Sequence, residues 1–376
     1  MRPQPISPQP AGPTSDSATV LGIETSCDET AAAVVRRHAD GRVEVLSSIV
    51  SSQVEAHAPF GGVVPEIAAR AHVESIDAII AEAMVAAGVD FADLDAVAAT
   101  AGPGLVGGVM VGLSVGKAIA LARGLPLVAV NHLEGHALSA RLGAPIAYPF
   151  LLLLVSGGHC QLLEVAGVGA CRRIGSTIDD AAGEAFDKIA KTLGLPYPGG
   201  PALEQLAAGG DPTRYPLPRA LLGRDGADFS FSGLKTAAAR IAERLTTDEE
   251  RRDLAAGVQT AIARQLAERT DKVMAAYREA HPGEAPRFVV AGGVAANAEV
   301  RRALSALAAK HGFDFFAPPL AYCTDNAAMI ALAGAERLAA GLVSGLDAVA
   351  RPRWPLDEAA AADRPTHVPG RKGAKA

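Results

Sequence analysis

Two histidines four residues apart, His132 and His136 in the motif NHLEGH, are the residues best suited to chemistry. On a helix this spacing places both imidazole rings on one face, close enough to bind a single metal ion. The apolar run at 125–130 predicts a buried strand, so the pair should lie just beyond a strand end, where α/β proteins place their chemistry. The alternative is a pair of ordinary helix-start residues, one capping the helix and one exposed.

The acidic residue of this motif, Glu134, follows the first histidine by two positions. It should therefore face away from the line joining the two rings. The His-Glu-x-x-His pattern of zinc proteases places its glutamate differently, as a general base beside the metal. This argues against a metallopeptidase.

A third metal ligand has to come from elsewhere, and Asp325 in the motif CTDN is the best candidate. The motif follows a predicted strand at 313–317 and opens an alanine-rich helix that runs to about Ala340. The alternative is that Thr324, Asp325 or Asn326 only caps that helix. Two histidines and one carboxylate with an open position form a catalytic metal site suited to zinc or ferrous iron.

Composition limits the class of protein. The chain has 376 residues, enough for two domains, and its net charge of −6 requires a local basic cluster or a partner for nucleic-acid binding. Its four cysteines are far apart and form no Cys-x-x-Cys, which suits a reducing cytosol. Residues 1–17 lack the apolar core of a signal peptide, and charged residues interrupt the apolar region 109–130, so we expect no membrane span.

Two apolar strands, at 20–23 and 150–155, each end in a small polar turn and are followed by a returning strand. Each half of the chain thus begins with a hairpin whose turn can approach a ligand closely. Two such lobes around a cleft are typical of the actin, Hsp70 and sugar-kinase group. The predicted fold class is therefore α/β, with a cleft between duplicated lobes.

Three glycine-rich loops are similar to nucleotide-binding motifs to different degrees. The loop at 102–107 matches G-x-G-x-x-G but contains a proline and lacks the later acidic residue, so it predicts a tight strand-to-helix turn. The segment 112–117 is one residue too short for a P-loop. The loop at 292–297 follows a clear strand, so its glycines could receive a phosphate or nucleoside and Asn297 could contact the ligand edge. A plain turn is the alternative there.

A further helix is predicted from the acidic segment that starts at Asp179 and Asp180. Acids in a first turn interact favourably with the helix dipole, which accounts for these two. Asp187 lies too deep for capping and could accept hydrogen bonds from ribose hydroxyls, or it could pair with Lys188 or Lys191. The turn at Gly199 and Gly200 would let backbone approach the same ligand.

Together these motifs closely resemble one family, the tRNA threonylcarbamoyladenosine biosynthesis proteins of the TsaD type, called Kae1 in archaea and eukaryotes. The resemblance covers about residues 20–350. It is carried by IETSCDET (23–30), GPGLVGG (102–108), NHLEGH (131–136), VSGGH (155–159), DDAAGEAFDK (179–188), YPGGP (197–201), GGVAAN (292–297) and CTDN (323–326).

The resemblance implies that the protein transfers a threonylcarbamoyl group from threonylcarbamoyl-AMP to N6 of adenosine 37, in tRNAs reading codons that start with A, and releases AMP. It implies one divalent metal ion bound by His132, His136 and Asp325, with Fe(II) favoured over Zn(II). It implies partnership with a TsaB-type paralogue and a TsaE-type ATPase in the cytoplasm. The implied adenylate site comprises Val155, Ser156, Gly157, Gly158, His159, Asp187, Gly200 and Asn297.

The resemblance identifies no general base, and two other activities stay open. One is an ATP-dependent kinase or ATPase of the same fold, although such proteins usually hold magnesium through carboxylates and phosphates. The other is the metallopeptidase considered above. We expect a disordered tail at 1–17, an N-terminal lobe at 18–145 joined by the helix after 322, a C-terminal lobe at 146–321, a closing helix at 322–350 and a flexible basic tail at 351–376.

Overall fold

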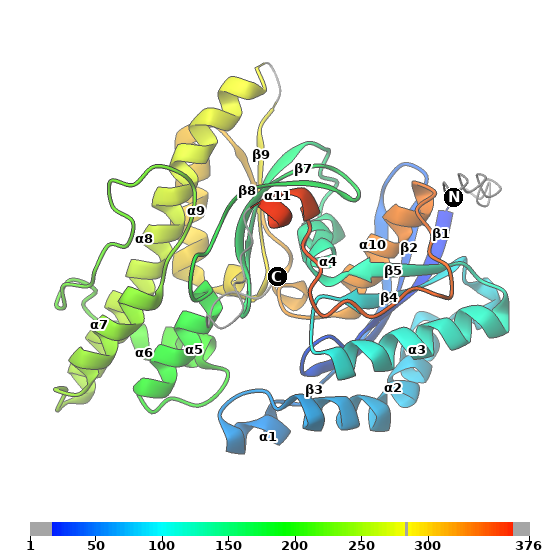
Figure 1. Ribbon diagram of the computed structural model, residues 1–376, viewed down its shortest axis with the longest axis horizontal. Coiled ribbons are helices and arrows are strands. Elements are labelled where there is room, and N and C mark those ends of the chain that lie inside the picture. Colours follow the sequence, from blue (N-terminus) through cyan, green and yellow to red (C-terminus); the bar gives the residue numbers. More distant parts are fainter. Residues whose placement is uncertain (1–16, 283–284, 364–376) are drawn as a thin grey trace.

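The computed structural model describes residues 17–282 and 285–363, which form two lobes that each contain a five-stranded sheet (Figure 1). The strand order is β3-β2-β1-β4-β5 in the N-terminal lobe and β10-β9-β6-β7-β8 in the C-terminal lobe. The strands are β1 (Ser17–Glu24), β2 (Glu29–His38), β3 (Val43–Ser52), β4 (Ala96–Gly102), β5 (Leu127–Asn131), β6 (Phe150–Val155), β7 (Cys160–Gly167), β8 (Ala170–Ser176), β9 (Arg287–Ala291) and β10 (Asp314–Phe316).

The helices cover both faces of the sheets. They are α1 (Val54–His57), α2 (Pro65–Ala87), α3 (Val106–Arg123), α4 (His132–Leu138), α5 (Ala182–Thr192), α6 (Gly199–Ala207), α7 (Ser232–Ala242), α8 (Asp248–Ala280), α9 (Ala298–His311), α10 (Ala327–Ala339) and α11 (Glu358–Asp363). The predicted hairpins are present: β1 pairs antiparallel with β2, and β6 pairs antiparallel with β7.

The N-terminal lobe is a three-layer unit. Leu21 and Ile23 of β1 pack in a core with residues of α2 and α3, while Val20 lies on the other face with α10. This alternation follows from the two-residue period of a strand whose two faces are both buried. Helix α10 comes from the far end of the chain and packs against β1, β2 and β4.

The C-terminal lobe has a larger core on one face of its sheet, built with α5 to α9. Its other face shares a core with the N-terminal lobe, in which Phe150 and Leu152 meet Val128 of β5 and Leu133 of α4. Strands β1, β4 and β5 run parallel, so their carboxyl ends reach one edge of the sheet. That edge faces the junction of the lobes.

The chain termini differ from the prediction. Ser17, assigned to the tail, begins β1 because it pairs with His38. The closing helix, predicted at 322–350, is shorter: α10 ends at Ala339, and Ser344 beyond it pairs with β5. Part of the predicted flexible tail is also ordered, since the segment 351–363 contacts Ala101 through the amide of Arg351 and accepts from the amide of Arg173 through Asp357. It thus crosses from one lobe to the other. The remainder of both predicted tails, 1–16 and 364–376, lies outside the described residues.

Helix α3 is, by length and composition alone, the one helix of the described residues that could cross a membrane. Here it packs against β4 and α2. A Cβ on Gly108 would lie 2.4 Å from the carbonyl oxygen of Thr25, and one on Gly112 would lie 2.3 Å from the Thr25 hydroxyl. These glycines of α3 therefore let the helix dock closely on the sheet. The predicted tight strand-to-helix turn at 102–107 is confirmed, since β4 ends at Gly102 and α3 begins at Val106.

Candidate metal centre and cleft

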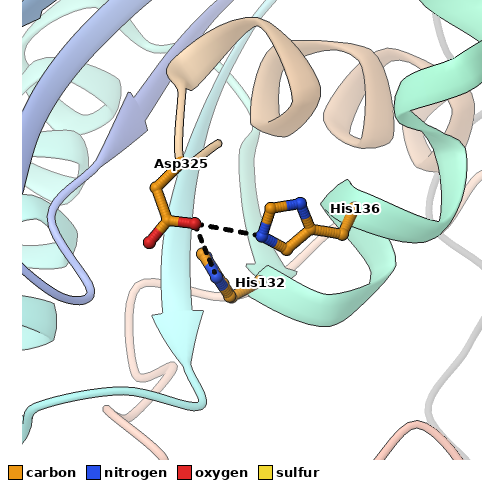
Figure 2. Close-up of side chains that lie close together, drawn as sticks. All are labelled: His132, His136 and Asp325. Atoms are coloured by element: carbon orange, nitrogen blue, oxygen red, sulfur yellow. Dashed lines mark hydrogen bonds and ion pairs between the residues drawn. The ribbon is translucent and has the colours of Figure 1, made fainter. Parts of the chain in front are cut away.

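The three predicted ligands meet at the junction of the lobes (Figure 2). Asp325 Oδ1 lies 3.0 Å from His136 Nε2 and 3.5 Å from His132 Nε2. One ligand atom from each side chain lies within 4.8 Å of the other two. Two imidazole nitrogens and a carboxylate oxygen converging in this way fit a zinc or ferrous-iron site.

Both histidines are buried, at 8% and 0% exposure, and neither caps the helix. The cap of α4 is Asn131, whose Oδ1 accepts from the amide of Leu133 at 2.9 Å. A Cβ on Gly135 would lie 2.9 Å from Ile330 Cδ1, so α4 lies directly against α10. The interpretation of the pair as one capping and one exposed histidine is therefore wrong.

Asp325 is left available because its neighbour performs the capping. Asn326 Oδ1 accepts from the amide of Met329 at 3.0 Å and begins α10. Burial alone would raise the pKa of Asp325, but His132 and His136 hold it well below its usual range. Asp325 thus lies in the cleft as a carboxylate.

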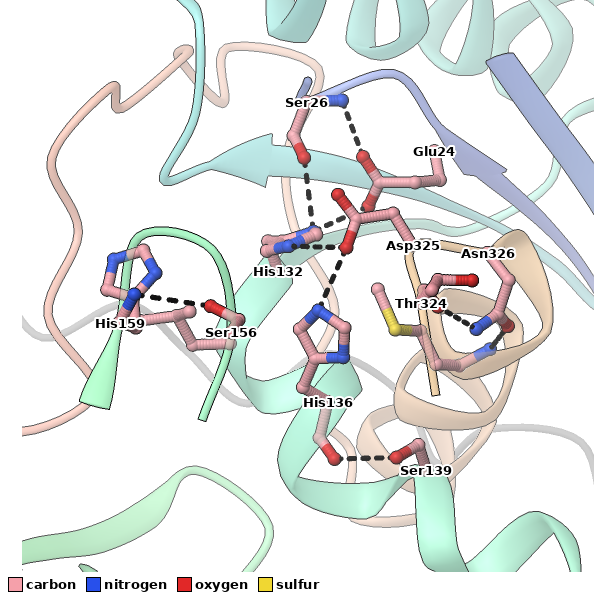
Figure 3. Close-up of polar contacts among 12 residues, drawn as sticks. Glu24, Ser26, His132, His136, Ser139, Ser156, His159, Thr324, Asp325 and Asn326 are labelled. Atoms are coloured by element: carbon pink, nitrogen blue, oxygen red, sulfur yellow. Dashed lines mark hydrogen bonds and ion pairs between the residues drawn. The ribbon is translucent and has the colours of Figure 1, made fainter. Parts of the chain in front are cut away.

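Glu24 and Ser26, for which the sequence predicted no role, contact the ring nitrogen of His132 that faces away from Asp325 (Figure 3). Glu24 Oε2 lies 2.9 Å and Ser26 Oγ 3.1 Å from His132 Nδ1. Burial would lower the pKa of His132, but Asp325 and Glu24 raise it to about 9. The sequence did contain a signal for the proximity of Glu24 and His132. Glu24 ends β1 and His132 follows β5, and parallel strands of one sheet bring their carboxyl ends to the same edge.

Glu134 points away from His132, His136 and Asp325, as predicted. Its Oε1 accepts from the amide of Gly169 at 2.7 Å, and its Oε2 lies 2.8 Å from Arg337 Nη1. Since both oxygens are engaged with the β7–β8 turn and α10, this carboxylate is not placed to act as a base beside a metal.

A cavity of about 940 Å³ opens between the lobes, beside the candidate metal centre. His132 and Asp325 line it, as do the predicted adenylate residues Ser156, Gly157, Gly158, His159 and Asp187. A Cβ on Gly157 or Gly158 would meet no atom within 4 Å. The β6–β7 turn therefore presents bare backbone to the cavity.

The other predicted adenylate residues do not line the cavity. Val155 is fully buried, and Gly200 lies in the first turn of α6. Asn297 caps α9 by accepting from the amide of Val300 at 3.0 Å, and its amide group donates to Gln259 at 2.9 Å. Its side chain is thus engaged within the C-terminal lobe.

The loop at 292–297 also differs from the prediction. A short 3₁₀ helix follows Gly292, and α9 begins only at Ala298. Gly292 has a φ of +94°, and a Cβ on it would lie 2.4 Å from the carbonyl oxygen of Val155. This glycine is required for close packing of the loop on β6.

Asp187 forms no ion pair with Lys188, which contradicts that alternative. Lys188 Nζ lies 2.9 Å from Asp180 and 2.6 Å from Glu184. Asp187 Oδ1 instead accepts from the amide of Gly199 at 2.8 Å. Burial raises the pKa of Asp187, although the backbone amides of Gly199 and Gly200 oppose this shift.

Asp179 and Asp180 do not belong to the helix they were assigned to, since α5 begins at Ala182. Asp179 accepts from the amides of Phe231 and Ser232 at the start of α7. Asp180 lies 2.6 Å from Lys235 of the same helix. The two acids therefore stabilise the packing of α7.

The two lobes, each with a five-stranded sheet and a β-hairpin, define an α/β protein with the fold of the actin, Hsp70 and sugar-kinase group. The structure of HypF from T. kodakarensis shares this fold, with a TM-score of 0.54 and 16% identity over 89% of this chain and 49% of that one. The predicted fold class is confirmed. A model of the TsaD family, described as tRNA N6-adenosine threonylcarbamoyltransferase, matches residues 44–332, and the chain belongs to this family.

Relatives that carry the same name agree with this assignment over almost the whole chain. A tRNA N6-adenosine threonylcarbamoyltransferase of Caulobacter vibrioides is 78% identical over 97% of this chain and 99% of its own length. The protein of the same name from Maricaulis maris is 59% identical over 99% of both chains. The protein is thus a transferase that acts on tRNA, and the resemblance drawn from its motifs is confirmed.

Proposed function

We propose that the protein transfers the threonylcarbamoyl group from threonylcarbamoyl-AMP to N6 of adenosine 37, in tRNAs reading codons that start with A. The observation that carries this proposal is the placement of two histidines and a carboxylate beside the bare β6–β7 turn, in one cavity. The turn suits the phosphate and nucleoside of an adenylate, since backbone amides can approach it without obstruction.

The ligand set fits one divalent metal ion, with Fe(II) as our first choice and Zn(II) as the second. A carboxylate on the far nitrogen of a ligating histidine is the usual support of a metal site, and Glu24 holds His132 in this way. Such an ion would polarise the adenylate and stabilise charge that develops as AMP leaves. His132, His136 and Asp325 would hold it.

The chain's own residues act mainly by positioning. The backbone amides of Gly157 and Gly158 would donate hydrogen bonds to the nucleotide phosphate. The carboxylate of Asp187 would accept hydrogen bonds from the ribose hydroxyls. The N6 nitrogen attacks the carbamoyl carbon, a new C–N bond forms, and the bond from that carbon to the phosphate oxygen breaks. One proton leaves N6, and the AMP phosphate carries away the electron pair. Holding both substrates in line supplies a large part of the rate.

The proposal includes partners. An acidic chain gains little from nonspecific attraction to tRNA, so a TsaB-type paralogue and a TsaE-type ATPase would complete the cytoplasmic machinery. Helices α2 and α3, which pack together, carry the exposed apolar side chains Val73, Val106 and Met110. A paralogue of the same fold would cover such a surface.

A single reconstitution tests the proposal. Purified protein, its two partners, labelled threonylcarbamoyl-AMP and unmodified tRNA are incubated, and the tRNA is digested to nucleosides. We expect labelled threonylcarbamoyl-adenosine and one equivalent of AMP. Absence of labelled nucleoside from the full mixture, together with turnover of ATP or cleavage of a peptide by the purified protein without its partners, would contradict the proposal and favour the kinase or peptidase alternatives.

A further inference from the structure

The cavity extends well beyond the residues assigned to the donor. Its volume of about 940 Å³ is near the upper end of the range for single-ligand sites, roughly 300–1,000 Å³. Helix α5 begins against the β6–β7 turn, where a Cβ on Gly183 would lie 2.6 Å from the carbonyl oxygen of Ser156. At the other end of this helix the cavity is lined by residues of the segment 191–197 and of the loop 58–63 in the N-terminal lobe. None of the contacts proposed above uses this end, which we call the outer pocket.

An aromatic ring lies on the wall of the outer pocket. Tyr197 is half-buried, and its hydroxyl donates to Asp28 Oδ2 of the opposite lobe at 3.4 Å. The phenol group is therefore anchored at its polar tip. Aromatic side chains of this kind are the usual platform on which proteins stack an unpaired nucleobase.

An exposed cation lines the same pocket as this ring. Lys191 lines the outer pocket and, within residues 17–282 and 285–363, has no carboxylate at ion-pair distance, in contrast to Lys188 with its two acidic partners. A Cβ on Gly61 of the facing loop would lie 2.9 Å from Lys191 Nζ. The glycine thus leaves room for the ammonium group, which is a suitable partner for a phosphate.

We propose that the outer pocket binds the acceptor nucleotide, an adenosine extruded from a single-stranded RNA loop. Its base would stack on Tyr197, and Lys191 would pair with a flanking phosphate. An enzyme that modifies an exocyclic amine has to take the base out of its stack, and a pocket next to the donor end receives it there. This inference rests on the proposed function, because it assumes an RNA acceptor.

The first test is Lys191→Gln in the full-length protein with its partners. We expect the KM for tRNA to rise about five- to tenfold, and the salt dependence of tRNA binding to weaken by roughly 0.7 in the log–log slope. The affinity for AMP, measured by calorimetry, should stay unchanged, and Lys191→Arg should retain most tRNA affinity. Lys310→Gln removes the same charge from an exposed residue of α9 and should behave as wild type.

The second test separates stacking from the hydroxyl contact. Tyr197→Phe keeps the ring and should keep most tRNA affinity, whereas Tyr197→Ala should weaken tRNA binding roughly 5- to 100-fold. Equal losses in both variants would mean that the Asp28 contact matters and the ring does not, which overturns the stacking proposal.

Two further outcomes decide the matter. If Lys191→Gln weakens AMP binding and leaves tRNA binding intact, the outer pocket belongs to the donor and the inference is wrong. Direct binding of tRNA is measured apart from turnover, so a wild-type protein that binds tRNA but makes no labelled nucleoside would refute the proposed function alone.

Discussion

Glu24 and His132, which are far apart in the sequence, are joined by a buried contact of 2.9 Å between Oε2 and Nδ1. Glu24 also accepts from the hydroxyl of Thr100 at 2.7 Å, so strands β1 and β4 both contribute to its position. A carboxylate can only accept, so Nδ1 of His132 carries the proton and Nε2 is turned toward Asp325. The contact therefore fixes the ring with Nε2 facing the proposed metal position.

Replacing Glu24 by Gln should lower metal affinity by roughly 10- to 100-fold, because His132 loses the group that orients it and raises its basicity. Competition with a chromophoric chelator measures the change. Glu66→Gln on the exposed face of α2 provides a matched control with no expected effect. Unaltered metal affinity in the Glu24 variant would show that the ring is held by packing alone.

Replacing His132 by Ala should abolish stoichiometric metal binding and the transfer activity while the fold survives. The wild-type protein should carry about one equivalent of iron or zinc, since the site offers one set of ligands. Elemental analysis and circular dichroism of both proteins provide the comparison. Full metal occupancy in the variant would refute the ligand assignment.

Replacing Gly158 by Val should weaken AMP binding, because its side chain would project into the part of the cavity where backbone now faces the ligand. We expect at least a tenfold loss, about 1.4 kcal/mol, in calorimetry. Gly167→Val is a suitable control, since Gly167 is equally open but lies at the other end of β7. If both variants bind AMP as wild type does, the turn has only a structural role.

Replacing Asp187 by Asn should weaken adenylate binding roughly ten- to a hundredfold, because a charge-assisted pair with the ribose hydroxyls contributes about 1.5–3 kcal/mol. The asparagine oxygen can still accept from the amide of Gly199, so the melting temperature without ligand should barely change. Calorimetry with AMP and a thermal melt give the two readings. A variant that unfolds, or one that binds AMP normally, would make Asp187 a structural residue.

Replacing Asp180 by Asn should produce a pH-dependent loss of stability. Burial would raise the pKa of Asp180, but Lys235 and Lys188 hold it below the usual value. Because the folded-state pKa is depressed, this carboxylate stabilises the protein above the unfolded value of about 3.9, and the contribution is lost as the pH falls through the folded value.

Urea unfolding should therefore show a destabilised Asp180→Asn variant at neutral pH and a shrinking difference from wild type under acidic conditions. Asp77→Asn on the exposed side of α2 serves as the comparison. A difference that stays constant with pH would mean that the ion pairs of Asp180 with Lys235 of α7 and Lys188 of α5 do not stabilise the fold.

The features that could be predicted from sequence were those with local signals. The spacing of His132 and His136 required only a helix after a strand, and the hairpins could be recognised from apolar runs that end in small polar turns. Glu134 was correctly excluded because its position relative to the histidines depends only on helical geometry. The third ligand, Asp325, was found because it begins a helix after a strand.

The features that could not be predicted depend on contacts between distant parts of the chain. Asn297 looked available for a ligand, but Gln259 of α8 engages its amide group. Asp179 looked like a first-turn acid of its own helix, yet it accepts from the start of α7. The order of segment 351–363 comes from pairing with Ala101 and Arg173. Pattern and propensity carry no information about such pairings.

The position of α10 has a consequence for the synthesis of the protein. A Cβ on Gly22 of β1 would lie 2.5 Å from the amide nitrogen of Ala331, so the second half of the N-terminal core is completed only by this helix. Residues 132–326 separate β5 from α10. At roughly 5–20 residues per second, the ribosome takes on the order of 10–40 s to deliver the missing helix. The larger core of the C-terminal lobe consists of residues 151–313 and can form first, whereas the apolar face of β1 and β2 that α10 covers stays exposed until this helix arrives.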